Sequence, residues 1–116
     1  MVIVNAGEVA INIPLAAYAL DVLIQKGVRR TGLQWKFSSA QAASLLTALV
    51  FLKADCPDRD EIFHGTKALE IHGFLGLPFV IEHTLRPDVV AIETDVERVA
   101  VIEHLRVMPP YATREE

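Results

Sequence analysis

The chain has 116 residues, a formal net charge of −4 and a hydrophobic fraction of 52%. This length is typical of one domain with one core, and its 11 basic residues are too scattered for a nucleic-acid surface. A mean hydropathy of +0.33 is high for so small a domain, so we expect some apolar surface to pack against another subunit. The lone Cys56 excludes an internal disulfide and is typical of a reducing, cytoplasmic compartment.

The first residues predict a strand followed by a helix. Residues 2–13 carry β-branched side chains around a turn-like segment, which indicates a short strand or hairpin. Pro14 suits the first turn of a helix, and Gly27 suits its end. Apolar side chains recur at helical spacing between them, so we expect one face of this helix to be buried.

A second strand and a second helix are expected next. Residues 33–37 alternate apolar and polar side chains, as a strand with one buried face does. Ser38 or Ser39 then suits the N-cap of a helix over 40–53, whose broad apolar stripe predicts a place in the core. The apolar part of this helix is too short to cross a bilayer, and the N-terminus lacks the basic start of a secretory signal.

Glycines and a proline separate two apolar runs, 69–72 and 79–83. No regular strand accommodates the intervening Gly-Phe-Leu-Gly-Leu-Pro sequence. We therefore expect Gly73, Gly76 and Pro78 to let the chain bend sharply. The two flanking runs are predicted to form a bent, paired ribbon.

The remaining runs complete an α+β fold. Residues 89–94 and 99–107 predict two more strands, and their short links favour antiparallel neighbours. We predict one α+β domain over 1–116, with two main helices packed on a mostly antiparallel sheet. The core is expected at 14–108, and 109–116 is expected to be a mobile tail.

A polar segment over residues 55–61 contains the cysteine and follows the second predicted helix. Its carboxylates disfavour the Cys56 thiolate, so we do not expect Cys56 and His64 to form a catalytic pair. The carboxylates also lack the spacing of a calcium loop. We expect an exposed loop that is solvated or contacts a protein partner. The partner-contact residues would be Asp55, Asp58, Asp60 and Glu61.

Three histidines fall on predicted strands. His72, His83 and His104 each lie within two positions of a glutamate, which raises the question of a metal site. None of these histidines has the short, fixed spacing to another that makes a zinc site convincing. We predict no metal, no cofactor and no catalytic residue.

Three sequence features follow one another between residues 15 and 108. A strand with a small-residue turn leads into a helix at 35–40, Gly-Phe-Leu-Gly-Leu-Pro-Phe-Val occupies 73–80, and Pro87-Asp88 precedes a Val-rich strand. This order resembles the axial domain of Hong Kong 97-type phage capsid proteins and their encapsulin relatives, whose motif has the form Gly-x-Leu-x-Gly-Leu-Pro-Val-Val. The chain has no room for the arm, extended loop and peripheral domain of a full capsid protein, so it resembles a free-standing axial domain.

The resemblance implies a non-enzymatic structural protein of viral or prophage origin, found in the cytoplasm or the virion. Copies of such a protein would pack around an axis as a ring-like homo-oligomer, without nucleic acid or membrane as partners. One alternative is a small phage-encoded binding or regulatory protein that acts on a host partner. A second alternative is a small metal-dependent or Cys/His enzyme.

Overall fold

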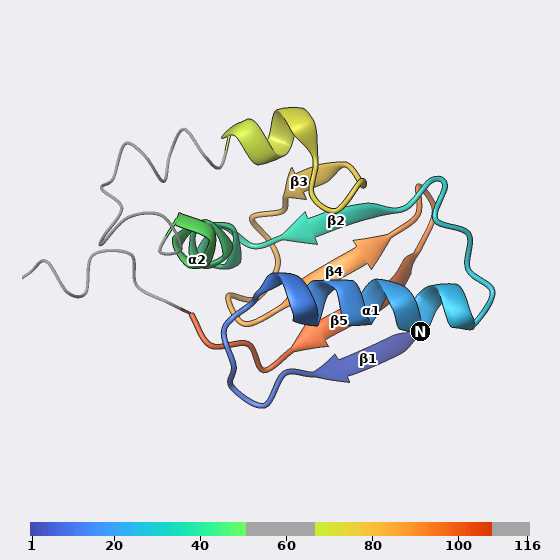
Figure 1. The fold of residues 1–116 in the computed structure, drawn as a ribbon, viewed down its shortest axis with the longest axis horizontal. Helices are drawn as coiled ribbons and strands as arrows, with labels where there is room; N and C mark the ends of the chain where they lie inside the picture. Colours follow the sequence, from blue (N-terminus) through green and yellow to red (C-terminus); the bar gives the residue numbers. More distant parts are fainter. Residues whose placement is uncertain (51–66, 108–116) are drawn as a thin grey trace, which may run out of the picture.

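A computed structural model describes residues 1–50 and 67–107 (Figure 1). A five-stranded sheet forms its centre, with the strand order β1-β5-β4-β2-β3. The strands are β1 (Val2–Asn5), β2 (Gln34–Phe37), β3 (Phe79–Ile81), β4 (Val90–Glu93) and β5 (Arg98–Glu103).

The predicted α+β class is confirmed, but the sheet is mixed rather than mostly antiparallel. β4 runs antiparallel to its neighbours β2 and β5, whereas β1 pairs parallel with β5 and β3 pairs parallel with β2. Parallel neighbours need a long connection, and the stretch between β2 and β3 supplies one. β4 and β5 form the antiparallel pair that the short link between them predicts. β1 is the predicted short strand, and it pairs with β5 instead of forming a hairpin.

Helix α1 (Ile13–Gln25) packs across β1 and β5. Asn12 caps its start, because the Asn12 side-chain oxygen accepts the Leu15 N–H at 2.8 Å, and Pro14 lies in the first turn as predicted. Its buried side chains are Ala16, Ala19, Leu20 and Leu23.

Helix α2 (Ser39–Val50) follows β2 directly. The Ser38 hydroxyl accepts the Gln41 N–H at 3.1 Å, so Ser38 supplies the predicted cap. Ala42 and Leu45 belong to the main core. In the part of the chain that is described, no helix is long and apolar enough to cross a membrane.

Aromatic side chains fill the core beneath the first helix. Trp35 and Phe37 are fully buried on one face of β2, as their alternation predicts. Phe74 and Phe79 pack against them, with ring centroids between 4.7 and 6.1 Å apart. The Trp35 indole N–H donates to the Phe74 carbonyl at 2.8 Å, so the buried indole keeps a hydrogen-bond partner.

The predicted strand over 69–72 is wrong, because 67–72 is helical. This segment begins Lys-Ala-Leu-Glu, a run of strong helix formers, and the Gly73 N–H donates to the Leu69 carbonyl at 2.8 Å where the helix ends. The bent, paired ribbon is therefore not formed, and β3 pairs with β2 instead. The last strand is also shorter than predicted: β5 ends at Glu103, since His104 takes a positive φ of 60°.

Candidate functional site

The chain reverses direction in a tight turn over 74–77, at the site of the predicted bend. Phe74 and Leu77 exchange backbone hydrogen bonds of 2.8 and 3.0 Å. The two central residues, Leu75 and Gly76, both have positive φ, at 49° and 78°, as type I′ turns require. The turn holds Phe74 against Trp35, so its immediate effect is on core packing.

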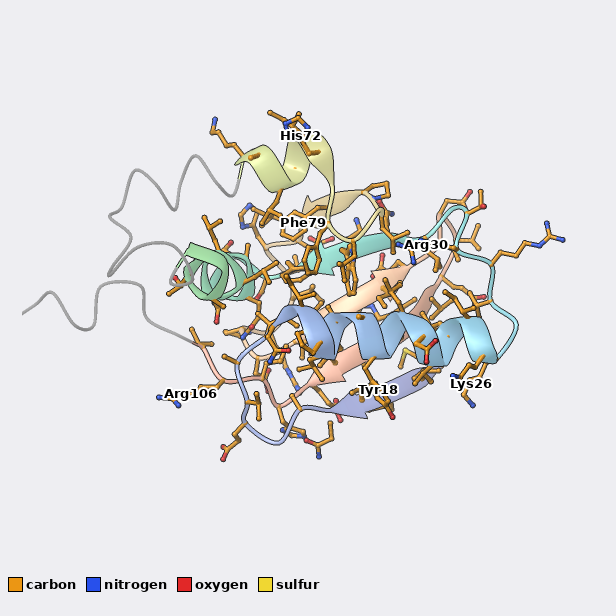
Figure 2. The ribbon with its side chains drawn as sticks, in the orientation of Figure 1. Tyr18, Lys26, Arg30, His72, Phe79 and Arg106 are labelled. Atoms are coloured by element: carbon orange, nitrogen blue, oxygen red, sulfur yellow. The ribbon has the colours of Figure 1, made fainter. Side chains whose placement is uncertain are left out.

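Neighbouring groups hold this turn tightly. The Gly73 φ is +83°, and a Cβ added there would lie 2.5 Å from the Leu77 carbonyl oxygen. The Pro78 carbonyl accepts the Trp35 N–H at 2.8 Å, which ties the turn to β2. The guanidinium of Arg30, which is labelled in Figure 2, donates to the Leu75 carbonyl. Gly73, Gly76 and Pro78 thus lie together, and no bound group is implied by their geometry.

The predicted partner-contact loop lies outside the described residues. The same is true of the Cys56 and His64 pair. The residues concerned are Asp55, Asp58, Asp60 and Glu61, together with Cys56 and His64.

The three candidate histidines lie on separate parts of the fold. His72 ends the helical segment 67–72 and is exposed. The His83 Nδ1 lies 2.9 Å from the Ser39 hydroxyl, beyond β3, while the His104 Nε2 lies 3.8 Å from a Glu103 carboxylate oxygen. Within 1–50 and 67–107, no group of three or more His, Cys, Asp or Glu side chains could hold a metal ion.

Sequence reasoning missed an open depression at the end of β5. It has a volume of about 500 Å³ and is lined by Glu8, Asp88, His104, Leu105 and Arg106. The Glu8 N–H donates to the His104 carbonyl at 2.8 Å, and both residues have positive φ. Glu8 and His104 lie far apart in the sequence, so no local motif points to this depression.

Sequence reasoning also missed the free edge of the sheet. β1 is the outermost strand on the side of β5, and among the described residues no strand pairs with its outer edge. Its side chains alternate between half-buried and exposed, and Ile3 is 58% exposed. A run of β-branched residues predicts a strand but does not say whether the strand is central or at an edge.

Comparisons of this chain with protein-family models, with curated proteins and with solved structures found no match. The resemblance to capsid axial domains stays a prediction.

Proposed function

We propose that this protein is a structural protein that assembles with copies of itself and has no enzymatic activity of its own. The observation that carries the proposal is the number of large apolar side chains left exposed on a small domain. Nine of them, in the described part of the chain, are between 39% and 83% exposed. They are Met1, Ile3, Val9, Ile13, Tyr18, Ile24, Ile71, Val96 and Val107.

Two of these side chains lie on opposite flanks of the first helix. On the flank toward the 74–77 turn, Ile24 lines an open recess of about 290 Å³ with the apolar Ala17, Leu20 and Leu75 and the charged Asp21 and Arg30. On the other flank, Tyr18 is 57% exposed and lies toward β1 (Figure 2). Single exposed apolar residues are normal, whereas grouped ones are typical of contact surfaces. Burial of such surface contributes about 25 cal/mol per Å² in favour of association, against the cost of the translational and rotational freedom that the two copies lose.

The resemblance to capsid axial domains supports the same proposal. The motif over 73–80 and the Pro87-Asp88 pair are its sequence support. A viral or prophage origin, a ring-like arrangement and a place in the cytoplasm or virion belong to this proposal. Assembly without catalysis is the function common to that group of proteins.

The proposal is tested by the mass of the protein in solution. Light scattering coupled to size exclusion, across a hundredfold dilution from the micromolar range, is expected to give a multiple of 12.8 kDa that decreases on dilution. A constant mass of 12.8 kDa at every concentration would contradict self-assembly.

A further inference from the structure

We infer that two copies of the chain pair antiparallel along the outer edges of β1 and join their sheets into one continuous sheet about a two-fold axis. The inference rests on the proposed self-assembly and names the surface through which it occurs.

β1 is short, which by itself limits pairing at an edge, but it carries no charged side chain, proline or bulge, and within 1–50 and 67–107 no strand pairs with its outer edge. Edge strands normally carry a charged side chain, a proline or a bulge that prevents another strand from adding to them. β1 has the sequence Val-Ile-Val-Asn, and its register with β5 runs without a shift from Val2 to Asn5. This edge is therefore open to a further strand.

The backbone hydrogen bonds show which groups are free. The Ala6 N–H donates to the Glu103 carbonyl at 2.9 Å, so the backbone groups of Ala6 face β5. Backbone groups alternate in direction along a strand, so those of Val2 and Val4 also face β5. The N–H and C=O groups of Ile3 and Asn5 consequently face outward. A second strand would satisfy them.

The opposite edge of the sheet is a poorer partner for β1. β3 is the outermost strand there, and the helical segment 67–72 lies beyond it (Figure 1). Head-to-tail pairing of β1 with β3 would have to displace this segment. Among the described residues, pairing of β1 with the same strand of a second copy meets no such obstacle, and such pairing is self-complementary.

One register pairs every outward-facing group. When Ile3 lies opposite Ile3 of the second copy, their backbone groups exchange both hydrogen bonds, and Met1 of each copy lies opposite Asn5 of the other. Val2 and Val4 pack into the core that α1 covers, so Ile3 points to the other face of the sheet. The exposed Ile3 side chain would then contact Ile3 of the second copy across the two-fold axis.

On the face of the sheet that carries α1, the side chains of the two copies also match each other in this arrangement. Tyr18 lies near the middle of α1 and toward β1, so it would sit close to the axis in both copies (Figure 2). Lys26 lines a recess with Met1 at one end of β1, while Glu8 follows the turn at the other end. Antiparallel pairing therefore brings Lys26 of one copy to the end where Glu8 of the other copy lies. Arg98 and Glu97 line the same recess and their charges offset each other, so Lys26 gives this end a positive charge opposite to that of Glu8.

Disulfide trapping tests the register. In a Cys56→Ser background, Ile3→Cys is expected to oxidise to a covalent dimer, because Cα atoms of a hydrogen-bonded antiparallel pair lie about 5.5 Å apart, within disulfide range. The control is Ile71→Cys, since Ile71 is 75% exposed on the segment beyond β3. Dimer yield at Ile3 should exceed that at Ile71 by about tenfold or more at equal concentration. Equal yields, or no dimer at Ile3, would overturn the inference.

Substitution of the edge separates this inference from the proposed function. Ile3→Lys places two ammonium groups opposite each other, and should weaken association by about tenfold or more, while Ile71→Lys should not change it. Ile3→Pro removes an outward-facing N–H and the isoleucine side chain but no hydrogen bond to β5, and should have the same effect as Ile3→Lys. Circular dichroism checks that each variant keeps its fold. An oligomeric wild type whose mass is unchanged by Ile3→Lys would refute the β1 pairing alone, whereas a monomeric wild type would refute self-assembly itself.

Discussion

Gly73→Ala should destabilise the fold by more than the half-buried position of Gly73, at the end of the helical segment 67–72, indicates. The residue has a φ of +83°, and an added Cβ would lie 2.5 Å from the Leu77 carbonyl oxygen. That oxygen belongs to the backbone and accepts the Phe74 N–H at 2.8 Å. It cannot move without opening the turn that holds Phe74 against Trp35.

Two costs add up at this position. A left-handed backbone conformation costs a residue with a Cβ about 1–2 kcal/mol. Displacing a packed backbone group costs a further 1–3 kcal/mol, roughly, including part of the Phe74 to Leu77 hydrogen bond. We expect Gly73→Ala to lower the free energy of unfolding by about 2–5 kcal/mol. Gly27→Ala isolates the first cost, because Gly27 has a φ of +88° and nothing lies within 4 Å of its added Cβ.

Urea denaturation followed by Trp35 fluorescence provides the measurement, since Trp35 is the only tryptophan and contacts the turn through Phe74. Gly27→Ala is expected to cost about 1–2 kcal/mol. If Gly73→Ala costs no more than Gly27→Ala, the close approach of the Leu77 carbonyl does not matter, and our explanation of this turn is wrong.

Three further substitutions test the core and the first helix by urea denaturation. The Trp35 variant has lost the only tryptophan and is followed by circular dichroism, whereas the other two are followed by Trp35 fluorescence. Trp35→Phe should lower the free energy of unfolding by about 1–3 kcal/mol, because the side chain loses volume and its hydrogen bond to the Phe74 carbonyl. The Phe74 carbonyl still accepts the Leu77 N–H, which limits the loss. A change under about 0.5 kcal/mol would contradict the buried contact. Leu45→Ala should cost about 2–5 kcal/mol, since Leu45 is fully buried, and a smaller loss would show that α2 does not pack there. Asn12→Ala should cost about 1 kcal/mol through loss of the α1 cap, with Asn12→Ser largely preserving stability.

Local sequence patterns predicted most elements of the fold but not how they pair. The proline at the start of α1, the Ser38 cap of α2 and the alternation around Trp35 act within a few residues, so periodicity and capping rules identify them. Strand order depends on contacts between distant segments. The parallel pairing of β1 with β5 joins the first strand to the last, and no local signal records it.

The segment 69–72 shows where local reasoning failed. Its Leu-Glu-Ile-His sequence alternates as a strand does, yet the stronger helix preference of Lys67 and Ala68 before it prevails, and Gly73 ends the helix. The free edge of β1 could not be predicted for a related reason. Whether a strand lies at an edge is decided by the complete sheet rather than by its own residues.

Amide hydrogen exchange at β1, measured by NMR at increasing protein concentration, tests self-assembly through this edge most directly. The Val4 N–H faces β5 and should be protected at every concentration, whereas the outward-facing N–H groups of Ile3 and Asn5 should become protected only as the copies associate. Fast exchange at Ile3 and Asn5 that does not change with concentration, while Val4 stays protected, would contradict the pairing of two copies along β1.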